Sequence, residues 1–402
     1  MIKPWFKYPH RLQNFVVDLL LAEISTLRQG LQTPVFNMPR MTLDESGLNV
    51  DSLEILALSI ALSRSIHLES SDIDDNLLNK ALLEDWATIS LKSLTVSSQF
   101  ISFKSSGSVG FKKYHTHILA HLEQEAEFLG QMLNGRKRIL RSVPSHHIYG
   151  FIFTVLLPRY LGDSVEVIDV RGYSFNTIQS LLQPGDLIIA YPEFWKLCED
   201  SNIDFPSDII GINSSGPCPM QVGVNLLEKS LSSFYEVYGS SETAGIGWKV
   251  HPLSEYKLFP FWKKTESVTE ISRLLLDGNL KNYQLQDDLR WSSPTNFFVG
   301  GRKDEVVQVG GINVSLNVVR EKLIKHTLIK DAAVRIMKPE EGSRLKAFIV
   351  LKDEYLDQKK FSTEIECYIN KSFSTAERPK SITYGLKIPV NKMGKKSDWP
   401  IE

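Results

Sequence analysis

The chain has 402 residues, enough for two or three domains that each bury a hydrophobic core. Its 46 lysines and arginines balance 47 aspartates and glutamates, so no overall charge attracts nucleic acid or an anionic membrane. With 42% apolar and 23% charged residues, the composition excludes a mainly disordered protein. The three cysteines form no C-x-x-C pair, which argues against a disulfide framework or a structural zinc site and favours a cytoplasmic location.

The sequence has the features of neither a signal peptide nor a membrane span. Asp18 and Glu23 interrupt the apolar residues near the N-terminus, and no small-residue cleavage site follows them. The uncharged run over residues 142–158 contains two histidines and is too short to cross a bilayer. We therefore expect neither secretion nor a membrane span.

Residues 1–95 have the pattern of a small all-α helical bundle. Apolar residues recur at helical spacing over residues 11–28, which predicts an amphipathic helix. Asp51 has the position of an N-cap for a second helix, and a short third helix is expected over residues 77–86.

After residue 96 the pattern changes to short β-branched runs that alternate with helical stretches, which predicts an α/β domain over residues 96–300. The expected helices and strands include residues 115–133, 165–170, 174–182 and 187–190. The glycine-rich segment from Gly301 predicts a two-stranded ribbon at a domain boundary. Residues 301–402 then have the pattern of a small α+β domain.

A loop rich in serine and glycine follows the strand-like residues 100–103. Glycines let backbone N–H groups approach an anion closely, and hydroxyls and a lysine add further donors. The candidate phosphate-binding residues are Ser105, Ser106, Gly107, Ser108, Gly110 and Lys113. The loop is not a Walker A motif, because its glycine spacing differs and no Ser or Thr follows the lysine. A solvated turn is the alternative.

Residues 238–243 have the sequence YGSSET, and at this point the pattern resembles a known family. The loop and this segment are similar to two motifs of the adenylate-forming superfamily, which includes acyl-CoA and aryl-CoA ligases, peptide-synthetase adenylation domains and luciferases. Further segments resemble the family's motifs in the same order: residues 144–150, 214–217, 288, 301–304 and 389–395. The resemblance covers residues 100–402 and implies a large α/β adenylation domain followed by a mobile α+β domain.

The resemblance implies a reaction in which a carboxylic acid attacks ATP, pyrophosphate leaves, and a thiol then displaces AMP. Lys395 would bridge the carboxylate and the α-phosphate, and Glu242 would hold Mg²⁺ on the phosphates. His147 would meet the acid's carboxylate, while Asp304 would be the hinge of the mobile domain. The other nucleotide-binding residues would be Ser215, Gly216, Tyr238, Gly239, Ser240, Thr243, Asp288 and Arg302.

Each of these residues has a plain structural alternative. Lys395 would belong to a solvated basic tail, Glu242 would be a surface acid, and Arg302 would form a structural salt bridge. His147 would be a packed histidine, as we expect for His146. The sequence also departs from the family, with Val109 and Lys112 in place of the usual threonine and proline, Gln308 in place of a lysine, and QDD at 286–288 in place of T-G-D.

Residues 48–54, LNVDSLE, resemble the L-G-x-D-S-L segment of acyl carrier proteins. That resemblance makes Ser52 a candidate for phosphopantetheine attachment, and a phosphate there would be favoured by the positive end of the helix. The bundle would then replace part of the family's usual N-terminal subdomain. The alternative is that Asp51 and Ser52 only cap a helix.

Together these features predict an ATP-dependent acid–thiol ligase whose acceptor is CoA or the phosphopantetheine of an acyl carrier protein. The short chain and the HHIYG segment at 146–150 resemble the ligases of aryl polyene and xanthomonadin pigment pathways, which implies a hydroxybenzoate-type aromatic acid. The segment around His147 is rich in aromatic residues, such as Phe151 and Phe153, which favours an aromatic acid over a fatty acid. The alternatives are a general medium-chain or aromatic acyl-CoA ligase, and a catalytically weak module that interacts with a carrier.

Overall fold

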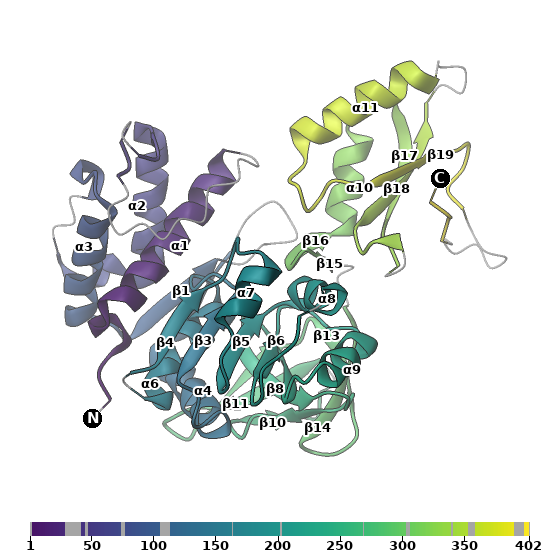
Figure 1. Ribbon diagram of the computed structural model, residues 1–402. Coiled ribbons are helices and arrows are strands. Elements are labelled where there is room, and N and C mark those ends of the chain that lie inside the picture. Colours follow the sequence, from purple (N-terminus) through teal and green to yellow (C-terminus); the bar gives the residue numbers. More distant parts are fainter. Residues whose placement is uncertain are drawn as a thin grey trace. The chain divides into compact units, whose positions relative to one another are not determined.

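The computed structural model describes residues 2–28, 42–44, 47–73, 77–104, 113–162, 164–201, 203–267, 269–302, 306–338, 341–352, 358–389 and 398–401. The chain forms two compact units (Figure 1). The first consists of residues from 2–104 and 114–300, and the second mainly of residues from 301–401.

The first unit begins with helices, as the apolar periodicity predicts. They are α1 (Pro9–Leu27), α2 (Ser52–Ile66) and α3 (Leu83–Val96), with short 3₁₀ turns at Trp5–Lys7, Leu68–Ser71 and Leu77–Asn79. The third helix starts at Leu83 rather than at residue 77, because the preceding residues form one of these turns. Asp51 caps α2 by accepting from the backbone N–H groups of Leu53 and Glu54, and Glu54 completes a capping box.

A nine-stranded sheet forms the centre of the first unit, in the order β13-β14-β9-β8-β7-β6-β5-β3-β4. Its parallel strands are β3 (Arg138–Arg141), β4 (Glu166–Asp169), β5 (Asp186–Ala190), β6 (Ile210–Asn213) and β7 (Ser233–Ser240). The sheet continues with β8 (Ala244–Val250), β9 (Tyr256–Leu258), β14 (Asn296–Arg302) and β13 (Asp287–Trp291).

Helices pack around this sheet, and two small sheets complete the unit (Figure 1). The helices are α4 (Leu119–Met132), α5 (Ile148–Gly150), the π-helix η4 (Phe151–Leu156), α6 (Pro158–Leu161), α7 (Phe175–Leu181), α8 (Pro192–Asp200) and α9 (Met220–Glu228). The small sheets are the hairpin of β1 (Phe100–Lys104) with β2 (Tyr114–Ile118), and the three strands β10 (Trp262–Lys264), β11 (Glu270–Leu274) and β12 (Leu280–Gln284).

The N-terminal helices share a hydrophobic core with the central sheet. Trp5 and Phe15 are fully buried and pack edge-on against Phe151, with ring centroids 5.1 and 5.5 Å from its own. The same core continues to Ile139 on β3 and Leu187 on β5. A domain boundary at residue 95 stays a prediction, whereas the shared core is a feature of the structure.

The second unit is a small α+β fold with its own core. It contains β15 (Val306–Val309), β16 (Ile312–Ser315), α10 (Leu316–Ile324), β17 (Ile329–Ile336), β18 (Leu345–Leu351), α11 (Gln358–Ser372) and β19 (Ser381–Tyr384). The strands β15 and β16 form the expected ribbon, and Gly310 and Gly311 turn it with positive φ angles of 58° and 74°. Of the helices described in either unit, none combines the length and apolar character needed to cross a membrane.

Candidate active site

The topology gathers three sequence motifs at one edge of the central sheet. Strands β3, β6 and β7 belong to the parallel part of the sheet, so their carboxyl ends lie on the same side. Residues 144–150 follow β3, residues 214–217 follow β6, and residues 238–243 end β7. Ligands of open α/β sheets bind outside the carboxyl ends of the strands. This edge is therefore the candidate active site.

The turn after β7 is held by its own hydroxyl groups. Thr243 Oγ1 accepts from the backbone N–H of Ser240 at 3.2 Å and donates to the carbonyl of Ala244 at 2.9 Å. Thr243 is buried, so its hydroxyl stabilises the turn. Gly239 is required here, because a Cβ at this position would lie 2.1 Å from the Ala244 oxygen.

The hairpin of β1 and β2 contacts this turn through two histidines. His117 donates from Nε2 to the carbonyl of Ser241 at 2.8 Å, and burial lowers the pKa of His117 to about 4, so the ring is neutral. His115 Nε2 lies 3.4 Å from Glu242 Oε1. The serine–glycine loop connects these two strands in the sequence, so the hairpin stem links two of the motifs. Residues 105–112 of the loop lie outside the described residues, and Lys113 is exposed.

Glu242 is accessible at the candidate site. Its carboxylate lies on the turn after β7, and its side chain is 37% exposed. Mg²⁺ is bound in such sites by one or two carboxylates together with phosphate oxygens and water. An accessible carboxylate is compatible with the role that the family resemblance implies for Glu242, and that role stays a prediction.

The segment after β6 forms a strained turn. Ser215 has a φ of 70°, a left-handed conformation that is costly for residues with a side chain. Asn213 donates from its amide to the carbonyl of Gly216 at 2.8 Å, and Ser214 donates to the carbonyl of Val237 on β7 at 2.8 Å. These bonds fix the backbone of Ser215 and Gly216 beside β7.

Glu236 on β7 stabilises the segment after β6 through a buried hydrogen bond to Cys218. The sequence motifs did not identify this residue. Its buried carboxylate accepts from the backbone N–H of Cys218 at 3.0 Å, from His251 at 3.2 Å and from the hydroxyl of Tyr256. Burial opposes ionisation, but hydrogen bonding from His251 and the nearby charge of Lys249 hold the pKa of Glu236 below its ordinary value.

Tyr238 is fixed by an aspartate that the sequence motifs did not identify. Its hydroxyl donates to Asp287 Oδ2 on β13 at 2.8 Å. Asp288 is the predicted ribose ligand, and its side chain is exposed. Successive residues of a strand point to opposite faces, so the two aspartates have different surroundings. The sequence QDD could not show which aspartate faces Tyr238.

The segment after β3 carries His147 and Tyr149. His147 is exposed at the start of α5, and its ring centroid lies 4.2 Å from that of His146. Tyr149 donates its hydroxyl to the carbonyls of Ala190 and Ile212, near the carboxyl ends of β5 and β6. The first turn of this helical segment is thus attached to two neighbouring strands at the candidate site.

Several predicted residues cannot be placed. Lys395, Asp304 and the loop residues Ser105, Ser106, Gly107, Ser108 and Gly110 lie outside the described residues, as does the side chain of Arg302. Their roles stay predictions. Ser52 is described, and it is exposed at the first position of α2.

The fold and the motifs at the strand ends define an adenylate-forming enzyme. Two solved structures show the same fold. The superposition on an amide bond synthetase from Marinactinospora thermotolerans covers 75% of this chain and 68% of the synthetase, with a TM-score of 0.60 and 14% identity. The superposition on an o-succinylbenzoate–CoA synthetase from Bacillus subtilis covers 81% of this chain and 73% of that synthetase, with a TM-score of 0.59 and 18% identity. The predicted fold class is confirmed.

Sequence similarity narrows this class. The chain is 34% identical over 356 residues to a 4-coumarate–CoA ligase from Halorhodospira halophila, covering 88% of this chain and 89% of the relative. It is 31% identical over 400 residues to a 4-coumarate–CoA ligase from Rhodobacter capsulatus, an alignment that covers 96% of this chain and 100% of that ligase. No protein-family model matches the sequence. The chain belongs to the family of AMP-forming acid–CoA ligases, so the predicted enzyme class is confirmed.

Proposed function

We propose that this protein activates a hydroxylated aromatic acid of the 4-coumarate type with ATP and transfers the acyl group to CoA. The observation that carries this proposal is the similarity to ligases of that name over nearly their whole length. The alignment with the Rhodobacter capsulatus ligase covers 96% of this chain, so it includes most of the N-terminal helices as well as the strand-end motifs.

The geometry of the strand ends supports this chemistry. Glu242 would hold Mg²⁺ on the phosphates, and the turns at residues 214–217 and 238–243 present backbone groups beside it. Bound Mg²⁺ neutralises charge that develops on the phosphates as pyrophosphate leaves. His147 is exposed at the same edge of the sheet, where it would meet the acid's carboxylate, and Lys395 would stabilise the negative charge on the α-phosphate.

The type of acid is supported by the relatives rather than by the aromatic residues after His147. The sequence predicts that the rings of Phe151 and Phe153 lie near an aromatic pocket. Both are 0–1% exposed, and Phe151 packs against Trp5 in the core. They therefore give no information about the acid. A hydroxybenzoate-type acid, as in the aryl polyene and xanthomonadin ligases, is the competing substrate of the same chemical class.

Substrate-dependent ATP–pyrophosphate exchange tests this proposal. The purified chain is supplied with 4-coumarate, 4-hydroxybenzoate, a long-chain fatty acid or acetate. We expect exchange with 4-coumarate to exceed exchange with the fatty acid and acetate, and CoA to yield the thioester. Exchange with 4-hydroxybenzoate and with none of the other acids would identify this shorter aromatic acid as the substrate. No exchange with any acid would contradict an enzyme and favour a module that only interacts with a carrier.

A second candidate acceptor is a phosphopantetheine arm on Ser52. The observation that favours it is the exposure of Ser52 at the capped N-terminus of α2, where a phosphate would be stabilised by the helix dipole. The chain is incubated with CoA and a broad-specificity phosphopantetheinyl transferase, and intact mass is measured. A gain of one arm that Ser52→Ala prevents would support the carrier. An unmodified chain that still makes acyl-CoA would exclude it.

A further inference from the structure

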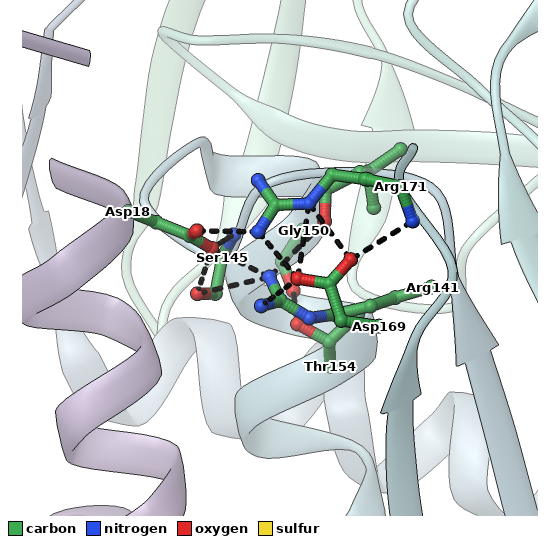
Figure 2. Close-up of polar contacts among 8 residues, drawn as sticks. Asp18, Arg141, Ser145, Gly150, Thr154, Asp169 and Arg171 are labelled. Carbon is green, nitrogen blue, oxygen red and sulfur yellow. Dashed lines mark hydrogen bonds and ion pairs between the residues drawn. The ribbon is translucent and has the colours of Figure 1, made fainter. Parts of the chain in front are cut away.

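The carboxylate of Asp18 on α1 joins a polar network with Ser145, Arg141, Arg171 and Asp169 (Figure 2). Its Oδ2 accepts from the Ser145 backbone N–H at 2.6 Å, from the Ser145 hydroxyl at 2.6 Å and from Arg141 at 2.5 Å. Its Oδ1 accepts from Arg171 at 2.6 Å. The side chain is only 3% exposed. One carboxylate from the N-terminal helix thus receives four donors from the strand ends.

The ion pairs alone do not explain all of these contacts. Asp169 at the end of β4 also accepts from Arg141 at 2.6 Å and from Arg171 at 2.5 Å, so two carboxylates balance two guanidinium groups. Burial opposes ionisation of Asp18, but Arg141 and Arg171 hold its pKa well below the ordinary value. The charged form therefore persists, and two of its four donors belong to Ser145 rather than to the arginines.

Ser145 is the part of this network that leads to the candidate site. It precedes His147 by two residues, in the short connection between β3 and α5. At the other end of this connection, a Cβ on Gly150 would lie 1.9 Å from the carbonyl oxygen of Pro144. Gly150 also accepts at its carbonyl from the hydroxyl of Thr154 at 2.7 Å. The connection thus packs closely against Gly150 in α5, and Asp18 holds Ser145 within it.

We propose that Asp18 is a positioning residue for His147, so that the N-terminal helix α1 forms part of the scaffold that recognises the acid's carboxylate. This inference rests on the proposed function, because it assigns His147 to the acid. Asp18 does not touch the substrate. It acts through Ser145, whose N–H and hydroxyl it holds while the neighbouring residues turn into the helix. A shift of this connection moves His147 relative to the acid, and misplacement by about 1 Å can cost about 10²-fold in rate.

Two variants and a matched control test the inference in the full-length chain. Asp18→Asn keeps the size of the side chain and removes the charge, and Ser145→Ala removes the hydroxyl donor while leaving the ion pairs. The control is Glu123→Gln, which removes a 2.6 Å ion pair with the buried Arg159. Arg159 also donates to the carbonyl of Lys3, so this pair likewise helps to anchor the N-terminus. Among the described residues, the hydrogen bonds of the Ser145 side chain go to Asp18 and Arg141 and not to this pair.

The assay is ATP–pyrophosphate exchange at a temperature well below the melting temperature of each variant. We expect Asp18→Asn to raise KM for the acid and lower kcat, with a combined loss of about 10- to 100-fold, while KM for ATP stays unchanged. Ser145→Ala should show a smaller loss of the same kind, and Glu123→Gln should resemble the wild type. If Asp18→Asn lowers only the melting temperature and leaves both kinetic constants unchanged, Asp18 is merely structural.

Amide hydrogen exchange over residues 144–151 provides a readout that does not depend on activity. Asp18→Asn and Ser145→Ala should accelerate exchange in this segment, whereas Glu123→Gln should not. If the wild-type chain activates no acid, the proposed function fails, and this measurement alone decides whether Asp18 holds the connection. Unchanged protection of residues 144–151 in Asp18→Asn would overturn the inference in either case.

Discussion

The N-terminal helices and the C-terminal unit flank the central α/β region in the sequence, but they bury their apolar residues in different ways. Trp5 and Phe15 pack against Phe151 in a core that continues into the parallel sheet. In the second unit, the buried residues, such as Ile365 and Leu345, pack with residues that all follow position 305. The first region is thus an integral part of its unit, and the second has the core of an independent domain.

This difference shows that two additions to one catalytic fold can serve different purposes. A region that shares the core, and reaches Ser145 through Asp18, can set the geometry of the site but cannot leave it without unfolding. A unit with a separate core can change position as a rigid body, as the family resemblance implies for the part that carries Lys395. The four predictions below test this division.

Replacing Lys395 by alanine should have the largest effect. We expect adenylate formation to fall by at least about 10³-fold, because the lysine would stabilise charge that develops on the α-phosphate. Thioester formation from a supplied acyl-adenylate should remain largely intact. Lys392→Ala, in the same basic segment, is the matched control and should retain both half-reactions. Equal loss of both half-reactions in Lys395→Ala would contradict a role confined to one position of the second unit.

Truncation of one buried side chain in each unit should separate their stabilities. Trp5→Ala should lower the free energy of unfolding of the first unit by about 3–5 kcal/mol, and Ile365→Ala that of the second by about 2–5 kcal/mol. Amide hydrogen exchange at increasing urea concentration measures the stability of each unit separately, because peptides from the two units are analysed apart. Trp5→Ala should weaken protection of β3 and β5 together with α1. If only residues 2–96 lose protection, the N-terminal helices unfold independently and the comparison fails.

The two units should also respond differently to pH because of Glu125 in the first. Burial raises the pKa of Glu125 to about 7, although it accepts from the N–H of Gly245 at 3.0 Å. Between the ordinary pKa near 4.5 and about pH 7, the folded state keeps a proton that the unfolded chain releases, so stability falls as pH rises. Glu125→Gln should remove about 2.5 kcal/mol of this loss between pH 5 and pH 8.

The measurement for Glu125 is urea unfolding at both pH values, followed separately for each unit. Among the described residues of the second unit, the carboxyl groups with shifted pKa values, Glu341, Glu377 and Asp398, are shifted downward, so this destabilisation should be confined to the first unit. An unchanged pH dependence in Glu125→Gln would show that another group causes it.

Replacing Glu242 by glutamine should have the smallest effect of the four. Loss of one negative oxygen ligand should weaken use of Mg·ATP by about 10- to 100-fold, with little change in KM for the acid. Raised Mg²⁺ should recover part of the activity. A collapse of acid affinity without recovery at high Mg²⁺ would show instead that Glu242 supports the turn.

The sequence predicted the fold class and the strand-end motifs because both depend on local patterns. The alternation of strands with helices predicts parallel strands, and parallel strands bring residues 144–150, 214–217 and 238–243 to one edge. The sequence could not reveal the contacts of Asp18, because a single aspartate on an amphipathic helix gives no indication of partners 123–153 residues away.

Two further features depended on side-chain direction, which the sequence does not show. Asp287 and Asp288 are adjacent acids, and only the twist and pairing of β13 decide which of them meets Tyr238. Phe151 and Phe153 looked like members of an aromatic pocket, but the π-helix turns both rings into the core. Whether two nearby residues of a helix line a pocket or the core can therefore be decided only when the position of the helix in the fold is known.

The contact between Asp18 and Ser145 has a consequence for synthesis of the chain. The two residues are 127 positions apart, so at about 5–20 residues per second the ribosome needs roughly 6–25 s to make the second after the first. During that interval, α1 has emerged while η4, whose Phe151 packs against Phe15, has not. The nascent chain thus lacks this partner of Phe15, and Asp18 gains its partners at and after the ends of β3 and β4 only once residues 141–171 have emerged and folded against the helix.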